Sequence, residues 1–421
     1  MEFIVSRNKL LQALIHTRCA IGKGDVLNVF KCFVFSFSTV PDGSPSGHAT
    51  MRVHASNGSL WMTETVLLDD DPVNPRPIAI YYCDLLKPIK ALDEQPLRFE
   101  VQEYQVIVHH SIGSFRMALY QDAEGFFSFK APAPDVEADD YYQLAYEAPC
   151  LKSVLGRCNF AMGKNDLRPV MAGVYFNLTD KFCDYVSSDC HKLVRVRKNR
   201  SADSTFVVND LSFIIPYPVV KALLKVLPPT GDAIVEYQKE LIKERTQTDS
   251  KGENKKYLFT GRKPQCRIII DNTLTISFNT VEGKYPDYWK VIPDSHNFKM
   301  TIDRKVLVKS VDRLSLFAGD TNCVKMDIDK TTLKLETEDS DLSLAGDETL
   351  PCECEPLDGR SLISLRIDMK AVCLSQTLKS LSTEEVVFLF QDETRAVLIQ
   401  PHPQPFNEEI TMLIMPMLCN D

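Results

Sequence analysis

The stretch Asn165–Arg197, NDLRPVMAGVYFNLTDKFCDYVSSDCHKLVRVR, decides the fold predicted for this chain. It begins at the end of a helix-like segment and crosses a strand in which apolar residues alternate up to residue 178. A turn at Asp180-Lys181 leads into a second strand that carries residues 187–193. Beyond it, valines and arginines alternate over 194–197, so the valines share one face and the arginines the other. The stretch therefore predicts antiparallel strands with one buried face.

The run Asp189-Cys190-His191 invites a catalytic interpretation, with a cysteine nucleophile and a histidine base. Within a strand, successive side chains point to opposite faces. Cys190 and His191 therefore cannot pair unless a bulge breaks the alternation. This geometry argues against a thiol or histidine enzyme. No phosphate-binding glycine loop, metal spacing or triad context supports that alternative elsewhere in the sequence.

Length and composition indicate an ordinary globular protein of about three domains, at roughly 150 residues per domain. The chain has 421 residues, of which 44% are hydrophobic and 25% charged. No run approaches the roughly 18 apolar residues that a membrane span needs. The N-terminal sequence MEFIVSRNKLLQAL predicts a strand and a helix rather than a signal peptide. We therefore expect a cytoplasmic protein, away from membranes.

Thirteen cysteines are present, and in the cytosol we expect them to be reduced and buried as small apolar residues. Cys352 and Cys354 form a C-x-C pair, but no second pair or nearby histidine completes a zinc site. We expect no metal and no cofactor. The net charge of −9 argues against a protein that holds nucleic acid by bulk attraction. It still allows basic residues confined to one surface.

An internal repeat is visible as a pattern rather than as sequence identity. Each copy begins with a helix-like segment that is poor in acids, and two of these segments have a good N-cap, Ser6 and Asp303. A second helix follows about 65 to 75 residues after the start of the first. The predicted first helices are Ser6–Ala20, Ala148–Met162 and Asp303–Ala318, and the predicted second helices are Cys83–Leu92, Tyr217–Leu227 and Asp368–Leu381.

All six predicted helices favour Lys and Arg, whereas acids concentrate on strands and loops. For a single helix, basic residues that simply face water explain such a composition. Six basic helices in an acidic chain instead suit a ring, with the helices lining a hole and the sheets outside.

Two connectors mark the predicted domain boundaries: a Pro-rich spacer at Lys130–Asp135 and the segment from Asp294 to Asn297. The predicted domains are 1–130, 139–293 and 297–421. Within the middle one, residues 239–256 are highly charged and have almost no core-forming residues. They predict a solvated hairpin extension or a flexible loop, with an extra DNA or partner contact as the alternative.

Several motifs, in this order and spacing, resemble the bacterial DNA polymerase III beta subunit, the three-domain DNA clamp family. They are Asn165-Asp166-Leu167-Arg168, Ser188-Asp189-Cys190-His191-Lys192-Leu193, Val281-Glu282-Gly283-Lys284-Tyr285-Pro286-Asp287-Tyr288, Lys290-Val291-Ile292-Pro293 and Leu413-Ile414-Met415-Pro416-Met417. The resemblance implies an α+β fold of three repeated domains, each with two helices packed on antiparallel sheets. It also implies a head-to-tail homodimer that forms a six-domain ring around double-stranded DNA. Its implied partners are a replicative polymerase, a clamp loader and other proteins with clamp-binding motifs.

The resemblance also implies three sets of functional residues. The peptide-binding groove would comprise Met171, Ser188, Cys190, His191, Lys192, Leu193, Pro286, Lys290, Val291, Leu413, Ile414, Met415, Pro416 and Met417. The DNA contacts would be Lys23, Lys152, Arg157, Arg168, Lys305, Lys309 and Arg313. The dimer seam would bring Phe115 of one copy against Leu316 and Phe317 of the other.

The sequence departs from the family at several of these positions. Cys190 stands where Gly is usual, Lys192 and Lys290 where Arg is common, and Pro169-Val170 replace aromatic residues. An apolar cleft rimmed by two lysines and a histidine still suits a short extended peptide with apolar anchors and a polar residue ahead of them. Because Lys lacks the planar fork of Arg, the preferred peptide can differ. A clamp-like docking scaffold without a role in replication stays open as an alternative.

Overall fold

The computed structural model describes the chain apart from residues 23–26, 39–48, 165–166, 200–209, 249–253, 340–341, 358–364 and 418–421. Two compact units make up the chain. One joins Met1–Lys152 with Lys221–Thr280, and the other joins Ser153–Val220 with Val281–Asp421. Each unit takes part of the predicted middle domain, because hydrogen-bonded sheets continue from that domain into its neighbours. The predicted boundaries at 130–139 and 293–297 remain predictions.

Six α-helices lie in the described part of the chain, and they fall where the repeat predicted them. Ser6 Oγ accepts a hydrogen bond from the Lys9 backbone N–H, and Asp303 Oδ1 accepts one from Val306 N–H at 2.8 Å, so both predicted N-caps are confirmed. The last helix begins later than predicted, because residues 365–370 form a strand. The helices are α1 Arg7–Thr17, α2 Tyr82–Ala91, α3 Ala148–Cys158, α4 Tyr217–Val226, α5 Arg304–Leu314 and α6 Ala371–Lys379.

The repeat has a structural signature that the sequence pattern did not reveal. A basic side chain from the first half of each first helix donates to backbone carbonyls at or just beyond the end of the second helix, where carbonyls have lost the usual bond from the N–H four residues on. Arg7 reaches Ile89 O at 3.0 Å and Lys90 O at 2.7 Å. Lys152 Nζ reaches Leu227 O at 2.6 Å. Arg304 reaches Thr383 O at 2.5 Å and Leu378 O at 3.3 Å.

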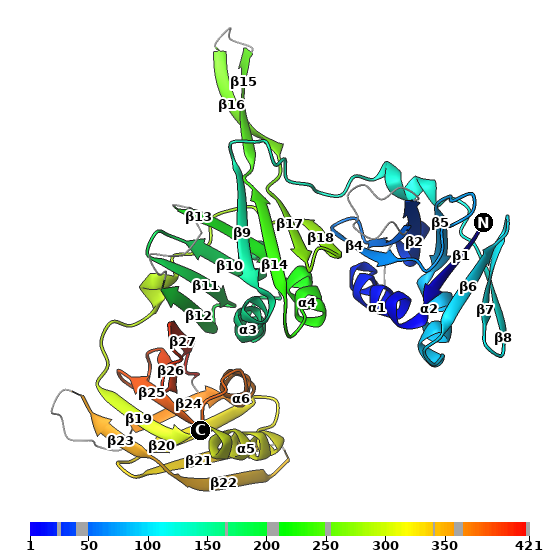
Figure 1. The fold of residues 1–421 in the computed structure, drawn as a ribbon. Helices are drawn as coiled ribbons and strands as arrows, with labels where there is room; N and C mark the ends of the chain where they lie inside the picture. The colour runs from blue at the N-terminus through cyan, green and yellow to red at the C-terminus, as the bar shows by residue number, and fades with distance from the viewer. Residues whose placement is uncertain are drawn as a thin grey trace. The chain divides into compact units, whose positions relative to one another are not determined.

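The first unit contains a four-stranded sheet, an eight-stranded sheet and a hairpin, all antiparallel (Figure 1). The eight-stranded sheet joins the first and middle copies where β4 pairs with β18. The hairpin pairs β15 with β16, so the hairpin form of the prediction for 239–256 is confirmed. In sheet order the strands are β1 Glu2–Ser6, β6 Pro96–Val101, β7 Gln105–His110 and β8 Gly113–Ala118; then β5 Ile78–Tyr81, β2 Cys32–Ser38, β3 Thr50–Ser56, β4 Leu60–Leu67, β18 Leu274–Asn279, β17 Gln265–Ile270, β14 Asp232–Gln238 and β9 Tyr141–Glu147; then β15 Leu241–Thr248 and β16 Asn254–Arg262.

The second unit contains a nine-stranded and a four-stranded antiparallel sheet. The larger sheet joins the middle and third copies where β12 pairs with β27 (Figure 1). In sheet order the strands are β13 Leu211–Pro216, β10 Gly173–Leu178, β11 Phe182–Ser188, β12 Lys192–Asn199, β27 Glu408–Ile414, β26 Val397–His402, β25 Glu385–Phe390, β19 Phe298–Asp303 and β23 Glu353–Pro356; then β22 Leu344–Pro351, β21 Thr332–Asp339, β20 Cys323–Ile328 and β24 Leu365–Lys370.

The nine-stranded sheet is covered differently on its two faces. On one face, Ser187 Oγ donates to Cys158 O at the end of α3 at 2.7 Å, and Ser380 at the end of α6 contacts Met412 Sδ. On the other face, the segment 281–292 packs Tyr285 and Tyr288 against the core residues of β11, β12 and β27. The helices therefore cover one face, and this segment covers part of the other.

The cysteine prediction is only partly right. Eleven described cysteines are not disulfide-bonded, and several are buried in the cores as expected. Cys323 is disulfide-bonded, which contradicts the expectation that all are reduced. Cys83 and Cys190 are exposed rather than buried. Among the described residues, no cluster of three or more metal-binding side chains is present, and no helix is long and apolar enough to cross a membrane.

Candidate functional site

The Asp-Cys-His run lies in a tight turn between β11 and β12, not inside a strand as the sequence predicted. Asp189 N–H bonds to Lys192 O at 3.3 Å, and the strands pair from Ser188 and Leu193 outward. Cys190 has a φ of +77°, a conformation that favours glycine. The strand-alternation argument against a Cys190–His191 pair therefore does not apply to this structure. A glycine at this position would adopt the same φ without the strain that a side chain adds.

Asp189 holds this turn together. Its carboxylate accepts hydrogen bonds from the backbone N–H groups of His191 and Lys192, both at 3.0 Å. It also pairs with Lys192 Nζ at 2.6 Å. Such carboxylate-to-backbone bonds are typical of Asp in turns. Lys192 is nearly buried and is engaged within the turn, so it does not form a free cationic rim.

The C-terminal segment adds the next wall of the site. β12 pairs with β27 so that Lys192 lies opposite Ile414 and Leu193 opposite Leu413. The strand ends at Ile414, and the chain continues past the turn, with Met415 N–H bonded to His191 O at 2.9 Å. Residues 415–417 therefore lie beyond the end of the strand. Met417 N–H bonds to Asp368 O at 2.9 Å, which holds the segment in place.

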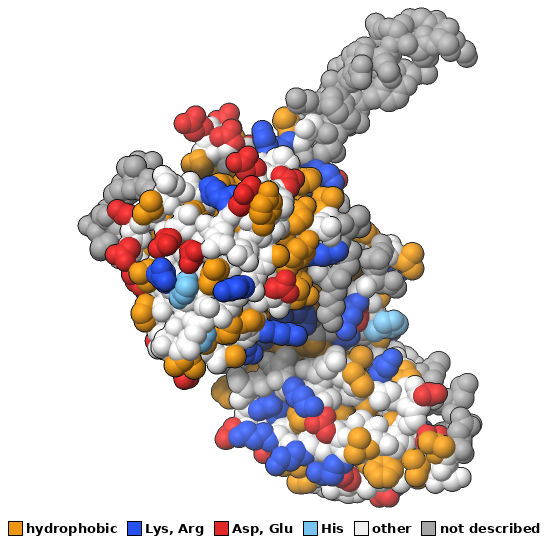
Figure 2. All heavy atoms as spheres, turned by 90° about the vertical axis from the view of Figure 1, so that its right-hand side faces the viewer, with side chains coloured by type: hydrophobic (Ala, Val, Ile, Leu, Met, Phe, Trp, Pro, Cys, Tyr) orange, Lys and Arg blue, Asp and Glu red, His pale blue; other side chains and the backbone are white. Residues whose placement is uncertain are grey.

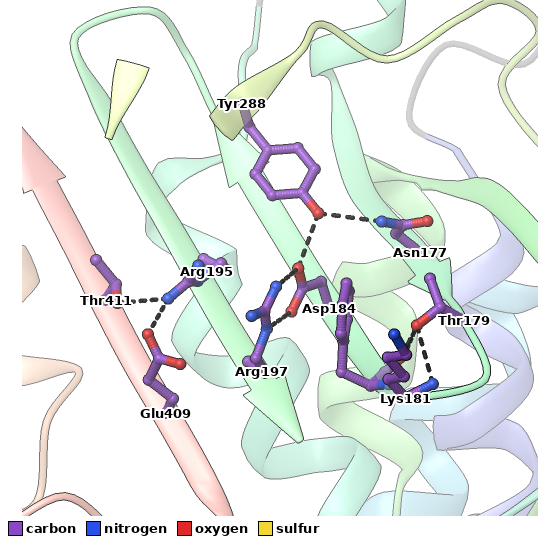
Figure 3. A network of polar contacts seen from close by, with 10 residues as sticks. Asn177, Thr179, Lys181, Asp184, Arg195, Arg197, Tyr288, Glu409 and Thr411 are labelled. Carbon is purple, nitrogen blue, oxygen red and sulfur yellow. Dashed lines mark hydrogen bonds and ion pairs between the residues drawn. The ribbon is translucent and has the colours of Figure 1, made fainter. Parts of the chain in front are cut away.

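The segment 285–291 supplies the third wall, and two tyrosines anchor it. Tyr285 is buried and stacks on Tyr175, with ring centroids 4.5 Å apart. Tyr288 is also buried, and its hydroxyl donates to Asp184 Oδ2 at 2.8 Å and accepts from Asn177 Nδ2 at 3.1 Å (Figure 3). Burial, followed by the nearby Asp184 carboxylate, raises the pKa of the Tyr288 phenol. This phenol therefore stays protonated as a donor.

The two arginines of β12 complete this anchor, as Figure 3 shows. Arg197 makes two hydrogen bonds of 2.8 Å to the fully buried Asp184. Arg195 binds Glu409 and Thr411 on β27. Both guanidinium groups lie over the ring of Trp289, at 5.2 Å for Arg195 and 4.5 Å for Arg197. Sequence reasoning placed the arginines on the correct face but missed their partners, because a strand pattern does not identify what covers it.

The segments that carry the residues predicted for the groove meet, but only some of these residues face solvent. The buried members form its support, and two of them contact Cys190: Met171 through its sulfur, and Ser188 Oγ, which accepts a hydrogen bond from the Cys190 N–H at 3.3 Å. Among the others, Val291 is 52% exposed and Met415 is 41% exposed, so an apolar partner could cover them. The buried members are Met171, Ser188, Lys192, Leu193, Leu413 and Ile414; the exposed or half-buried members are Cys190, His191, Pro286, Lys290, Val291, Met415, Pro416 and Met417.

Comparisons with known proteins agree with this architecture. Residues 289–418 match the family described as DNA polymerase III beta subunit, C-terminal domain. A curated beta sliding clamp of Staphylococcus aureus is 25% identical over 286 residues, which cover 68% of this chain and 66% of that protein, just under two thirds. The beta sliding clamp of Staphylococcus epidermidis is 24% identical over the same length.

Solved structures extend the likeness to the whole chain. DNA polymerase III beta subunits from Thermotoga maritima and Pseudomonas aeruginosa superpose with TM-scores of 0.79 and 0.78, at 18% and 17% identity, and cover 100% of both chains. The chain has the fold of the DNA polymerase III beta subunits. The resemblance read from the motifs and the predicted α+β clamp fold are therefore confirmed.

Several of the basic residues predicted to contact DNA already make contacts within the fold. Lys152 caps α4, and Arg157 pairs with Glu408 at 2.7 Å, with both side chains mostly buried. Arg313 forms a two-pronged pair with Glu348, and Arg168 lies on the Cys190 sulfur. Lys23 lies outside the described residues.

Lys305 and Lys309 on α5 are exposed, and neither ammonium group pairs with a described residue. In Figure 2, Lys and Arg side chains gather at the bottom of the view, the height at which α5 lies in Figure 1, with a few carboxylates among them. Among the described members of the predicted set, these two lysines are therefore free to bind a phosphate.

The residues predicted for the dimer seam are accessible within their own units. Phe115 lies on β8, an edge strand, and its ring lies 4.7 Å from that of His110. Leu316 is 77% exposed and Phe317 is 37% exposed, just after α5. The Phe317 ring lies near Gly346 on β22, which is also an edge strand. Each predicted partner therefore lies on or beside an unpaired sheet edge.

Proposed function

We propose that this chain is a DNA polymerase processivity factor: a homodimeric ring that encircles double-stranded DNA and tethers a replicative polymerase. The full-length likeness to DNA polymerase III beta subunits supports the ring. The observation that carries the docking role is the meeting of three segments, the 189–192 turn, residues 415–417 and the 285–291 segment, beside exposed apolar side chains. The role is non-catalytic and cytoplasmic, because tethering needs binding alone and bacterial replication takes place there.

The docking groove would take a short extended peptide from the polymerase, the clamp loader or another partner. Val291, Met415 and Met417 offer apolar surface for anchoring side chains, and thioether groups adapt to several partners. His191 and Lys290 would face the polar part of the peptide. Pseudomonas aeruginosa and Bartonella birtlesii clamps have been solved bound to griselimycin, so proteins of this fold do hold a ligand. We include griselimycin as a second probe of this groove.

The groove is tested by truncating its apolar side chains. Replacing Met415 and Met417 with Ala should cost about 1–3 kcal/mol of binding for each anchor. A micromolar peptide has only about 8 kcal/mol of binding free energy, so the double variant should bind near the millimolar range. The measurement is fluorescence anisotropy with overlapping peptides from the replicative polymerase of the same organism.

Phe406→Ala is the matched control for this experiment. Phe406 is 91% exposed and precedes β27, at the end of that strand opposite to Met415. Its loss should leave affinity unchanged. A well-folded Met415→Ala, Met417→Ala protein that keeps full affinity would move the docking site elsewhere.

The ring is tested by its molar mass in solution. Light scattering should give twice the chain mass of 47.7 kDa. Leu316→Asp with Phe317→Asp should give a folded monomer, because the charges would be buried without partners at both symmetric seams. Leu357→Asp, a change at a 49% exposed leucine that follows β23 and is not among the predicted seam residues, should remain dimeric. A dimeric double variant would refute the assigned seam.

A further inference from the structure

Cys190 differs in its surroundings from the other exposed cysteine in the described part of the chain. Its thiol is exposed at the tip of the 189–192 turn, inside the proposed docking groove. Arg168 Nη1 lies 2.6 Å from its sulfur, and Met171 Sδ lies 3.6 Å from it. Cys83 is also exposed, but its sulfur lies 3.2 Å from the Asp84 carboxylate. One exposed thiol thus has a cation beside it and the other an anion.

A second observation points to a missing polar partner at the same place. Tyr285 is only 5% exposed, and its hydroxyl, next to the Ser188 backbone, makes no hydrogen bond of good geometry to a described residue. Burial, and then the nearby Cys158 and Cys190, raise the pKa of this phenol, so it stays a donor. A buried donor without an acceptor is costly. An oxygen atom added to Cys190 would offer an acceptor.

We propose that Cys190 is a peroxide-sensitive thiol that controls peptide docking in the groove. The proposal rests on the docking role given above. The sulfur attacks one oxygen of hydrogen peroxide, an S–O bond forms and the O–O bond breaks. The thiol proton leaves with the departing hydroxide as water, so sulfur is oxidised by two electrons and peroxide is reduced. The product is a sulfenic acid, which a small thiol can return to the reduced state.

The neighbours of Cys190 favour formation of the sulfenic acid, and its place in the groove makes the sulfenic acid affect peptide docking. The Arg168 guanidinium stabilises negative charge on the sulfur during attack, whereas Asp84 opposes such charge on Cys83. In the product, the Arg168 guanidinium lies beside the new oxygen as a donor, and the unpaired Tyr285 hydroxyl is a second candidate donor. The oxygen also adds a polar group to a surface that an apolar anchor of the peptide would cover. Oxidation should therefore weaken docking.

The first experiment locates the modification in the intact full-length protein. Hydrogen peroxide is added in the presence of dimedone, which traps sulfenic acids, and labelled cysteines are mapped by mass spectrometry. Cys190 should be labelled at a peroxide concentration about tenfold below that needed for Cys83. Arg168→Met should remove most of this advantage. Equal labelling of the two residues, or none at Cys190, would overturn the proposal.

The second experiment measures docking before and after oxidation with the fluorescent polymerase peptide, and separately with griselimycin. Oxidation should weaken binding about tenfold, as one added polar group in an apolar contact would. Dithiothreitol should restore it. Cys83→Ser should respond like the unmodified protein, and Cys190→Ser should lose the response whatever its own affinity. If the unmodified protein binds neither probe, the docking role fails; if it binds but oxidation changes nothing, only this inference fails.

Discussion

Helices α3 and α5 hold the same place in the repeat, yet their basic side chains serve different purposes. On α3, Lys152 caps α4 and Arg157 lies in a mostly buried pair with Glu408. On α5, Arg304 takes the capping role, whereas Lys305 and Lys309 remain exposed and unpaired among the described residues. The sequence presents both helices as basic. Only the structure, which shows the partner of each charge, distinguishes the basic residues that stabilise the fold from those that can bind DNA.

The comparison also changes how the acidic chain can bind DNA. A basic residue that is already paired adds little to the field at a helix surface, because its partner cancels its charge. The free cations of α5 therefore matter more than the total number of Lys and Arg residues. Phosphate contacts of this kind position a protein on DNA without reading its sequence.

The largest expected effect on stability comes from Arg157. Arg157→Ala leaves the Glu408 carboxylate mostly buried, with Lys198 Nζ at 2.8 Å as its remaining partner. Breaking a buried pair costs about 3–5 kcal/mol, and the remaining partner should reduce this to about 2–3 kcal/mol. Urea unfolding of Arg157→Ala against Lys309→Ala measures the difference. If the two variants are equally stable, the basic side chain of α3 does not stabilise the fold more than that of α5.

An intermediate effect is expected at the helix caps. Arg304→Ala removes hydrogen bonds to two carbonyls and should cost about 1–2 kcal/mol of stability. Arg304→Lys should keep part of this stabilisation, since Lys152 caps the second helix of the middle copy with a single hydrogen bond of 2.6 Å. Lys305→Ala, one residue along the helix, is the matched control and should be neutral. If Arg304→Ala also leaves the melting temperature unchanged, the cap shared by the three copies does not contribute to stability.

The smallest effect on stability, under about 0.5 kcal/mol, is expected for Lys305→Glu with Lys309→Glu. DNA binding should nevertheless suffer, because each lost phosphate contact removes about 0.9 from the slope of log K against log salt. Titration of nicked circular DNA at several salt concentrations gives that slope, with the melting temperature as a check on folding. An unchanged slope in a stable protein would exclude α5 from the DNA surface.

The fold could be predicted from the sequence because its signals are local. Helix periodicity, the N-caps Ser6 and Asp303 and the turn at Asp180-Lys181 depend on neighbours in the chain, and each lies where expected. The six helices also follow from a repeat that appears three times. Agreement among local signals is what makes a sequence specify a fold.

The site was harder to predict because its contacts join segments far apart in the chain. The 189–192 turn was mistaken for a strand, since nothing in Asp-Cys-His announces a positive φ at a cysteine. Met415 bonds to His191 in that turn, although the two residues lie far apart in the sequence. Arg168 lies on the Cys190 sulfur, a contact that the sequence did not reveal, and its predicted contact with DNA stays a prediction. A residue's type gives its chemistry, whereas its partner must come from the structure.

The most direct test of the central claim is retention on DNA of defined topology. The protein is loaded onto nicked circular DNA by its clamp loader, the complex is isolated by gel filtration, and the circle is then cut once by a restriction enzyme. A ring that encircles duplex DNA should stay on the circle at a salt concentration that abolishes binding to linear DNA, and should slide off after the cut. Equal retention on circular and linear DNA, or loss from both, would contradict the account.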